Sequence, residues 1–126
     1  MTCCIAGDQD LVDDAGLETT GEFDERMAQL KKIIGRKKGW TIIGSSLGGL
    51  MGTVFTCQKP TYVRKLILLA PALMKDPFGS YLELEPVSVP TIIIHGTADD
   101  VVPLDEARTY AEKFFALVTR LCLVTQ

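Results

Sequence analysis

The sequence predicts an α/β fold, a three-layer sandwich with a mostly parallel sheet. Residues 40–43, 63–69 and 91–95 are short, largely apolar runs, as expected for strands that are buried on both faces. Segments with helical periodicity lie between them, and this alternation is typical of helices packed on a parallel sheet. The right-handed crossover rule then predicts that the strands follow one another in sequence order, with helices on both faces of the sheet.

Length and composition limit the possible classes of protein. The 126 residues are expected to form one domain or part of one, and 47% hydrophobic with 23% charged residues is enough for a packed core. The net charge of −3 offers no basic surface to a phosphate backbone, so nucleic acid is not an expected partner. The longest apolar run, residues 66–74, is too short to span a membrane, and residues 1–7 do not resemble a signal peptide. A cytoplasmic location is therefore expected.

The first third of the chain is expected to contain a strand and a helix. Residues 2–6 fit a short strand, and the polar residues 7–21 are expected to form a loop. Thr19 and Glu22 have the spacing of a capping box, which predicts that a helix begins there and ends in the basic turn of residues 31–38. The apolar stripe of this helix comprises Phe23, Met27, Leu30 and Ile34.

The remaining elements follow from periodicity and from proline and glycine. Residues 47–58 are apolar nearly all round and rich in glycine, which predicts a buried helix close to the sheet. An irregular stretch is expected over residues 70–90, because four of the six prolines occur there. The first of these, Pro71, lies near the beginning of the stretch. Pro103 opens a further helix and residues 118–124 fit a last strand. The apolar stripe of the last helix comprises Leu104, Ala107, Ala111 and Phe114.

Residues 44–48, Gly-Ser-Ser-Leu-Gly, match the pattern G-x-S-x-G only with Ser46 as the central serine. The pattern joins a predicted buried strand directly to a glycine-rich helix, the context in which a sharp turn lifts a serine hydroxyl above a sheet. Gly44 and Gly48 leave room for a strained turn, and the N–H of Leu47 would point at an anion that develops beside Ser46. The alternative interpretation is a glycine-rich helix start that only packs closely.

With three further segments, this motif makes the chain resemble the α/β-hydrolase superfamily, in particular its small esterase-like and lipase-like serine hydrolases. Residues 95–103, His-Gly-Thr-Ala-Asp-Asp-Val-Val-Pro, are similar to the loop that carries the triad acid, and the resemblance assigns that role to Asp99. Residues 63–73 resemble the strand and turn after the nucleophile helix, and residues 8–30 resemble the segment before the nucleophile strand. The resemblance implies hydrolysis of carboxylic esters through an acyl-serine at Ser46.

The resemblance also implies groups that we do not find in this sequence. A serine nucleophile needs an imidazole to take its proton, and the single histidine, His95, stands where the family has a non-catalytic residue. A structural hydrogen-bonding role is therefore favoured for His95, with the role of base as the lesser alternative. No segment before Ser46 resembles the loop that supplies the second oxyanion donor. We expect a chain that is truncated at both ends, the C-terminal part of such a fold, with weak or absent activity.

The sequence is also compatible with two other functions, and it indicates which ligands to expect. One alternative is a catalytically silent hydrolase-fold fragment that acts by binding or assembly, and another is an unrelated doubly wound domain that matches G-x-S-x-G by chance. No cofactor or metal is expected, because neither the acidic pairs at 13–14 and 99–100 nor the cysteines have companion ligands at suitable spacing. The cysteines are interpreted instead as small buried side chains, Cys3, Cys4, Cys57 and Cys122. If the chain is active, a small ester-like molecule is the expected substrate.

The strand at residues 40–43 also leads to a prediction about assembly. In the resembled family this strand is flanked on both sides, whereas here its outer edge would be exposed unless residues 2–6 fold across it. An apolar, unpaired strand edge favours association with another chain. We therefore expect a homodimer, capture of a complementary fragment, or aggregation through this edge.

Overall fold

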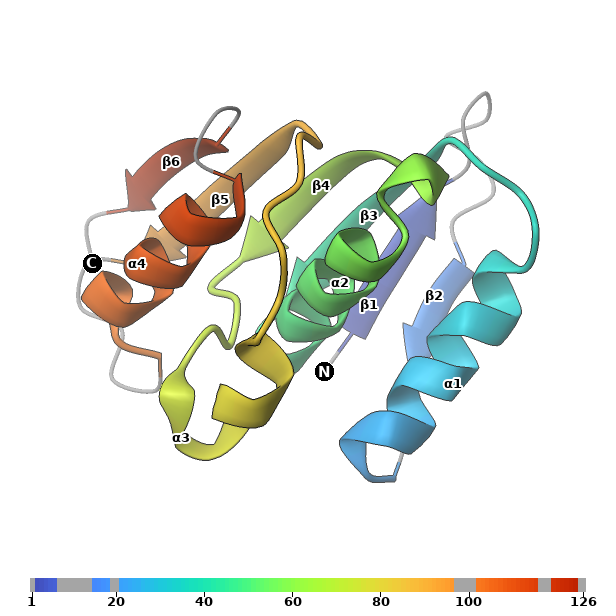
Figure 1. Ribbon diagram of the computed structural model, residues 1–126, viewed down its shortest axis with the longest axis horizontal. Helices are drawn as coiled ribbons and strands as arrows, with labels where there is room; N and C mark the ends of the chain where they lie inside the picture. The colour runs from blue at the N-terminus through green and yellow to red at the C-terminus, as the bar shows by residue number, and fades with distance from the viewer. Residues whose placement is uncertain (1, 7–14, 19–20, 97–101, 116–118, 125–126) are drawn as a thin grey trace.

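The structure is a computed structural model that describes residues 2–6, 15–18, 21–96, 102–115 and 119–124. Within them, six strands form one sheet in the order β2-β1-β3-β4-β5-β6 (Figure 1). The strands are β1 (Thr2–Ala6), β2 (Ala15–Glu18), β3 (Trp40–Ser45), β4 (Val63–Leu69), β5 (Thr91–Gly96) and β6 (Thr119–Val124). The helices are α1 (Phe23–Ile34), α2 (Leu47–Gln58), α3 (Lys75–Phe78) and α4 (Leu104–Phe115), with 3₁₀ turns η1 (Pro60–Tyr62) and η2 (Gly79–Leu82).

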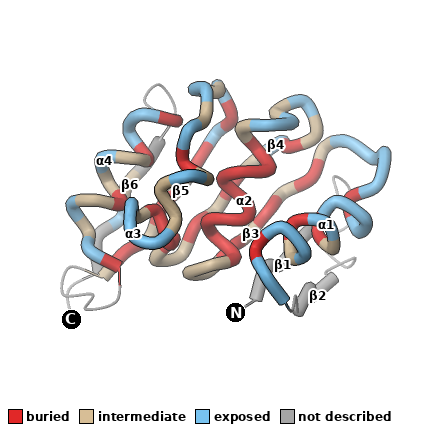
Figure 2. Tube along the Cα trace, turned by 60° about the horizontal axis from the view of Figure 1, so that its bottom comes forward, coloured by how far each residue is buried: buried red, intermediate tan, exposed pale blue. Residues whose placement is uncertain are grey.

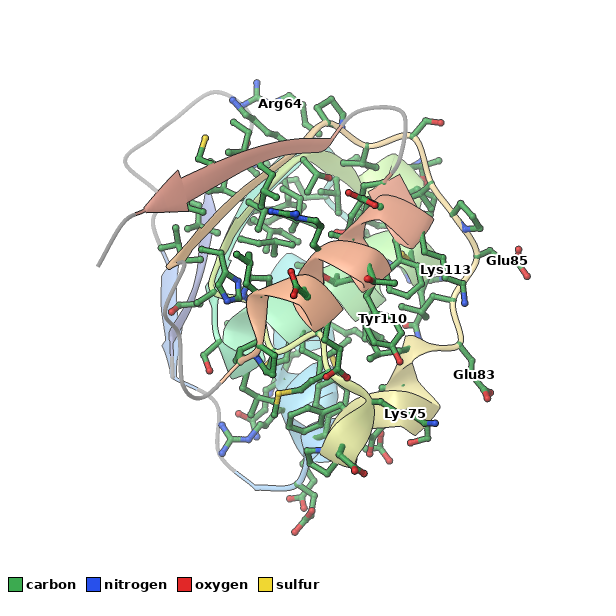
Figure 3. All side chains as sticks on the ribbon, turned by 90° about the vertical axis from the view of Figure 1, so that its left-hand side faces the viewer. Arg64, Lys75, Glu83, Glu85, Tyr110 and Lys113 are labelled. Carbon is green, nitrogen blue, oxygen red and sulfur yellow. The ribbon has the colours of Figure 1, made fainter. Side chains whose placement is uncertain are left out.

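The described helices lie on one face of the sheet, so this part of the chain has two layers where we expected three (Figures 1 and 3). The cause is the strand order. The connections β2-α1-β3, β3-α2-β4, β4-α3-β5 and β5-α4-β6 all advance in the same direction across the sheet, between parallel strands. Right-handed crossovers that advance in one direction place every helix on the same face. Helices on both faces would require the strand order to reverse direction within the sheet. We predicted strands in sequence order, and that order is compatible only with helices on one face.

The outer edge of β3 is covered, which overturns the predicted exposed edge. β1 pairs with β3 in an antiparallel arrangement, with Cys3 opposite Gly44 and Ile5 opposite Ile42. Residues 2–6 therefore fold across the outer edge of β3. We predicted association through that edge only if residues 2–6 left it unpaired, so the reason for that prediction is removed. β1 also pairs with β2, which lies within the segment that we expected to be loop. The sheet is mostly parallel, as predicted, with β1 as the antiparallel strand.

The helix α1 begins later than its sequence pattern indicated. Its N-cap is Glu22, whose N–H donates to the Oε1 of Glu25 at 3.3 Å. The predicted capping box between Thr19 and Glu22 is therefore wrong, and Thr19 lies outside the described residues. A glutamate three residues into the helix satisfies the free N–H of the cap residue, and that interaction does not require serine or threonine at the cap. The four apolar residues predicted for this helix are all buried.

The helix α2 has the predicted bounds and is the most deeply buried helix, with residues 48–56 all buried (Figure 2). It lies against β3 and β4 because its small residues allow a close approach. A Cβ added to Gly52 would lie 3.1 Å from Cγ2 of Ile42 and 3.3 Å from Cδ1 of Leu66. β4 also has its predicted bounds, whereas β3 and β5 extend further than predicted, to Ser45 and Gly96. This end of the sheet carries the motif residues.

Residues 75–90, which we call the strap, connect the region after β4 to β5. They include α3 and η2 as short turns and are otherwise irregular, as expected. The strap is attached to α4, because the N–H of Val87 donates to the carbonyl of Phe114 at 3.0 Å and the N–H of Lys75 donates to Oε2 of Glu106. Figure 3 shows Tyr110 and Lys113 of α4 on the side of the molecule that the strap occupies.

The two cysteines with described side chains differ in how far they are buried. Cys57 of α2 is half-buried, and burial raises the pKa of its thiol to about 12. Cys122 of β6 is exposed, so our interpretation of it as a buried side chain is wrong. It lies on the edge strand β6, where alternate side chains face away from the helices.

This difference predicts unequal reactivity of the two thiols. Since the thiolate is the reactive form, we expect iodoacetamide at pH 8 to alkylate Cys122 rapidly and Cys57 only on unfolding. Mass spectrometry of peptides after timed quenching measures the two rates in one sample. A Cys122→Ser variant serves as the control and should lose the fast modification at that peptide only. Equal rates at Cys57 and Cys122 in the folded protein would contradict the burial of Cys57.

No helix in the described ranges is long and apolar enough to cross a membrane.

Candidate active site

Ser46 occupies the sharp turn between β3 and α2. Its backbone angles are φ 53° and ψ −115°, in a region that favours glycine and that a serine occupies only under strain of about 1–3 kcal/mol. Leu47 is the first residue of α2, so the chain passes from strand to helix through this one residue. This is the geometry that the glycine-rich sequence predicted for a serine lifted above the end of a sheet.

Backbone hydrogen bonds hold the turn in place. The N–H of Ser46 donates to the carbonyl of Leu69, the last residue of β4, at 3.0 Å. The carbonyl of Ser46 accepts from the N–H groups of Gly49, Leu50 and Ala72, at 3.0, 3.2 and 2.9 Å. The strained residue is therefore bonded on both sides to α2 and to the segment after β4. Such surrounding bonds are what allow a strained backbone conformation to persist in a folded protein.

Gly44 of the motif and the adjacent Gly49 have no room for a side chain. A Cβ added to Gly44 would contact the carbonyl oxygen of Gly48 and lie 2.6 Å from its carbonyl carbon and 2.8 Å from the nitrogen of Gly49. A Cβ added to Gly49 would lie 2.7 Å from Cβ of Pro71. Gly44 and Gly48 are both buried. Only backbone atoms fit between the end of β3 and the first turn of α2.

Residues 70–72 contribute to this turn in a way that we did not predict from the sequence. Ala70 also has a positive φ of 44°, and its N–H donates to the carbonyl of Ile94 at 2.8 Å. Pro71 packs on Gly49, and the N–H of Ala72 bonds to Ser46. The Ala-Pro-Ala sequence after the strand was the available signal, because proline restricts the residue before it. Without the tertiary structure, its bond to the serine turn was not predictable.

The serine turn lies at the carboxyl edge of the parallel strands, which is the lower edge of the sheet in Figure 1. Ser45, Leu69 and Ile94 are in register across β3, β4 and β5, so Ser46 and His95 follow these positions at the same edge. Asp99 lies in residues 97–101, outside the described residues. The described residues on either side of that gap are Gly96 at the end of β5 and Val102 before α4. Ligands of open parallel sheets bind at this edge.

His95 is directed into the protein. Its side chain is 1% exposed, and its Nε2 lies 3.0 Å from the carbonyl oxygen of Val102. A ring nitrogen facing a carbonyl acts as a donor, so Nε2 carries the proton in this arrangement. The bond joins the end of β5 to the residue just before α4, on either side of the segment that contains Asp99. No cluster of three or more His, Cys, Asp or Glu side chains that could hold a metal ion occurs among the residues that the structure describes.

Comparison with known families agrees with this geometry. A sequence model described as the alpha/beta hydrolase fold matches residues 6–88, which is most of the chain and includes the serine turn. The chain belongs to the α/β-hydrolase fold family. The predicted resemblance to the α/β-hydrolase superfamily is thereby confirmed at the level of family and fold. The match includes residues 44–48 and ends before residues 95–103. A comparison with curated proteins finds no match.

Solved structures of α/β hydrolases superimpose on the chain. A monoacylglycerol lipase from Paleococcus ferrophilus is 15% identical with a TM-score of 0.72, and the match covers 89% of this chain and 68% of the lipase. Alpha/beta hydrolase domain-containing protein 10 from mouse is 18% identical with a TM-score of 0.69, covering 90% and 64%. A hydrolase of the alpha/beta superfamily from Xanthomonas campestris pv. campestris is 27% identical with a TM-score of 0.64, covering 84% and 58%. The chain thus spans roughly two thirds or less of the length of these α/β hydrolases.

Proposed function

We propose that this α/β hydrolase cleaves carboxylic esters through an acyl-serine at Ser46. The observation that carries the proposal is the strained backbone of Ser46, φ 53°, at the junction of β3 and α2. Strain of this kind in a non-glycine residue concentrates at functional sites, because a fold without a use for it favours glycine there. The similarity to a monoacylglycerol lipase supports an ester as the substrate class.

In this proposal each motif residue has a stated role. The hydroxyl oxygen of Ser46 attacks the ester carbonyl, the alcohol leaves with a proton, and water then releases the acid from the acyl-serine. The N–H of Leu47, at the N-terminus of α2, donates to the developing oxyanion. Gly44 and Gly48 allow the close backbone contact that holds the turn. Asp99 is the acid of the triad, as the family resemblance implies.

A Ser-Asp-His triad also requires a base. His95 is the one histidine of the 126 residues, and its Nε2 is engaged with the carbonyl of Val102. Loss of the base lowers kcat about a millionfold in a serine protease, or about 8 kcal/mol of barrier. We therefore propose slow acylation of Ser46 by this chain. A second candidate function is binding of an ester-like ligand without turnover. The burial of His95 favours this function, because a buried imidazole that is engaged with Val102 does not act as the base.

Labelling with a fluorophosphonate probe tests the nucleophile. We expect slow labelling that maps to Ser46 by mass spectrometry, because Ser46 is only half-buried but in this proposal no base activates its hydroxyl. The Ser46→Ala variant should show no labelling, and Ser45→Ala is the matched control that should retain it. Turnover of nitrophenyl esters should be about a millionfold below that of a complete esterase. Labelling that persists in Ser46→Ala would refute the proposal.

Adding a base from solution tests whether the missing base is what limits acylation of Ser46. Imidazole should raise the rate of acylation in proportion to its concentration, since it can take the proton of Ser46 if the site is open. The Ser46→Ala variant measures the reaction of imidazole with the ester alone and is subtracted. A His95→Gln variant keeps a donor for the carbonyl of Val102 and should leave the rate unchanged. A large loss of labelling in His95→Gln would instead identify His95 as the base.

A further inference from the structure

One cavity lies beside the serine turn and a second lies between α1 and α2, and the same pair of aromatic rings lines both of them. The first, which we call the elbow cavity, has a volume of about 370 Å³. Its lining consists of apolar and aromatic residues together with a charged side, namely Leu47, Pro77, Phe78, Phe23 and Tyr81, and Gly21, Glu22 and Arg26. The second, which we call the helix cavity, has a volume of about 240 Å³ and lies between α1 and α2. Phe23 and Tyr81 line both cavities.

The ring pair forms a compact wall. The ring centroids of Phe23 and Tyr81 are 4.2 Å apart with an angle of 37° between the planes. Phe23 belongs to the buried face of α1 and is 8% exposed, so its position is determined by the core. Tyr81 comes from η2 in the strap and is only half-buried, whereas its neighbour Leu82 is buried and anchors the strap. Tyr81 is therefore the part of the wall that can be removed without removing a core residue.

The elbow cavity begins at the nucleophile turn. Leu47 directly follows Ser46 and lines the cavity. A group attached to the Ser46 oxygen with its carbonyl oxygen near the Leu47 N–H would thus have this space beside it, with Leu47 and Phe78 on its apolar side. The volume of the cavity is within the range of about 300–1,000 Å³ that is common for ligand pockets. Five of its eight lining residues are aromatic or aliphatic, and a hydrocarbon chain would lie against these rather than against Glu22 and Arg26.

We propose that the elbow cavity holds the hydrocarbon chain of the ester and that the Phe23–Tyr81 ring pair sets the longest chain it accepts. This inference rests on the proposed function for its substrate, and it adds the substrate class: esters whose hydrocarbon chain ends at the wall. Longer chains must leave toward solvent, because the helix cavity lies behind the two rings. Removing the Tyr81 ring joins the two cavities and extends the space available to a chain.

Binding of unbranched 1-alkanols, from butanol to dodecanol, tests the wall without requiring acylation. In the native protein the affinity measured by calorimetry should rise about fourfold for each added methylene and then level off at one chain length. In Tyr81→Ala the rise should continue for several more methylenes before it levels off. Ser80→Ala, an exposed neighbour in the same turn, should keep the native break-point. The same break-point in Tyr81→Ala and in the native protein would overturn the inference.

A second pair of variants keeps the test independent of folding defects. Ala28 is exposed on α1 and lines the helix cavity, so Ala28→Phe fills that cavity from its rim. Added to Tyr81→Ala, it should return the break-point toward the native chain length, whereas alone it should have no effect. If Tyr81→Ala does not fold, Tyr81→Leu replaces it with a smaller expected extension. No return of the break-point in the double variant would overturn the inference.

Failure of this inference can be told apart from failure of the proposed function. A break-point that shifts in Tyr81→Ala while Ser46 stays unlabelled supports the wall and refutes the ester chemistry. Labelling of Ser46 with an unchanged break-point supports the chemistry and refutes the wall. When both hold, fluorophosphonates with longer alkyl chains should label Tyr81→Ala faster than the native protein.

Discussion

Replacing Gly44 by alanine should lower the free energy of unfolding by about 3 kcal/mol or more. The added Cβ would contact the carbonyl group of Gly48 and the nitrogen of Gly49, and these are backbone atoms of a buried helix that cannot rotate away. Relief requires α2 to move away from β3, which separates apolar surfaces throughout the core. The cost therefore reaches the upper part of the range for overpacked sites, where backbone shifts are needed.

Urea unfolding followed by circular dichroism measures this loss, and Gly79→Ala is the matched control. A Cβ at Gly79 would lie 3.3 Å from Cγ of Lys75, an exposed and flexible side chain, and Gly79 has ordinary helical backbone angles. The control should change stability by less than about 1 kcal/mol, and in the favourable direction if the Lys75 side chain moves freely. Equal stability of Gly44→Ala and Gly79→Ala would show that β3 and α2 are not in the described contact.

Replacing Ser46 by glycine should stabilise the protein relative to Ser46→Ala, although both changes remove the hydroxyl. Alanine keeps the Cβ and with it the strain of a positive φ, about 1–3 kcal/mol. Glycine adopts φ 53° without that strain, but it loses more freedom on folding, which offsets about 0.4–1 kcal/mol. The net advantage of Ser46→Gly over Ser46→Ala is expected to be about 1 kcal/mol.

Thermal unfolding of the two variants at equal concentration measures the difference, which should be a few degrees for a chain of this size. Labelling by fluorophosphonate should be absent in both variants. A higher melting temperature of Ser46→Gly than of Ser46→Ala means that a residue with a Cβ is strained at this position, a cost that is common at reactive residues. A Ser46→Gly variant no more stable than Ser46→Ala would show that the turn is not strained.

The sequence by itself determined the longer helices and the parallel strands, and the position of the serine turn, but not the short strand β2. The bounds of α2 and β4, and the buried stripe of α1, followed from the spacing of apolar residues, because periodicity is a property of contiguous residues. The turn at Ser46 followed for the same reason: glycines on both sides of a serine, between a strand and a helix, are a local pattern. The local capping pattern at Thr19 was the exception, since the spacing of Glu22 and Glu25 supplied the cap instead.

The tertiary structure alone decided how distant segments meet. It placed β1 antiparallel across the edge of β3, because a five-residue apolar run fits a sheet in either direction and sequence does not distinguish them. It brought Pro71 and Ala72 onto the serine turn and engaged His95 with Val102, seven residues later. It also stacked Phe23 of α1 on Tyr81 of the strap. Each contact joins residues that no periodicity relates, since side-chain packing across elements depends on the shapes that the whole chain presents.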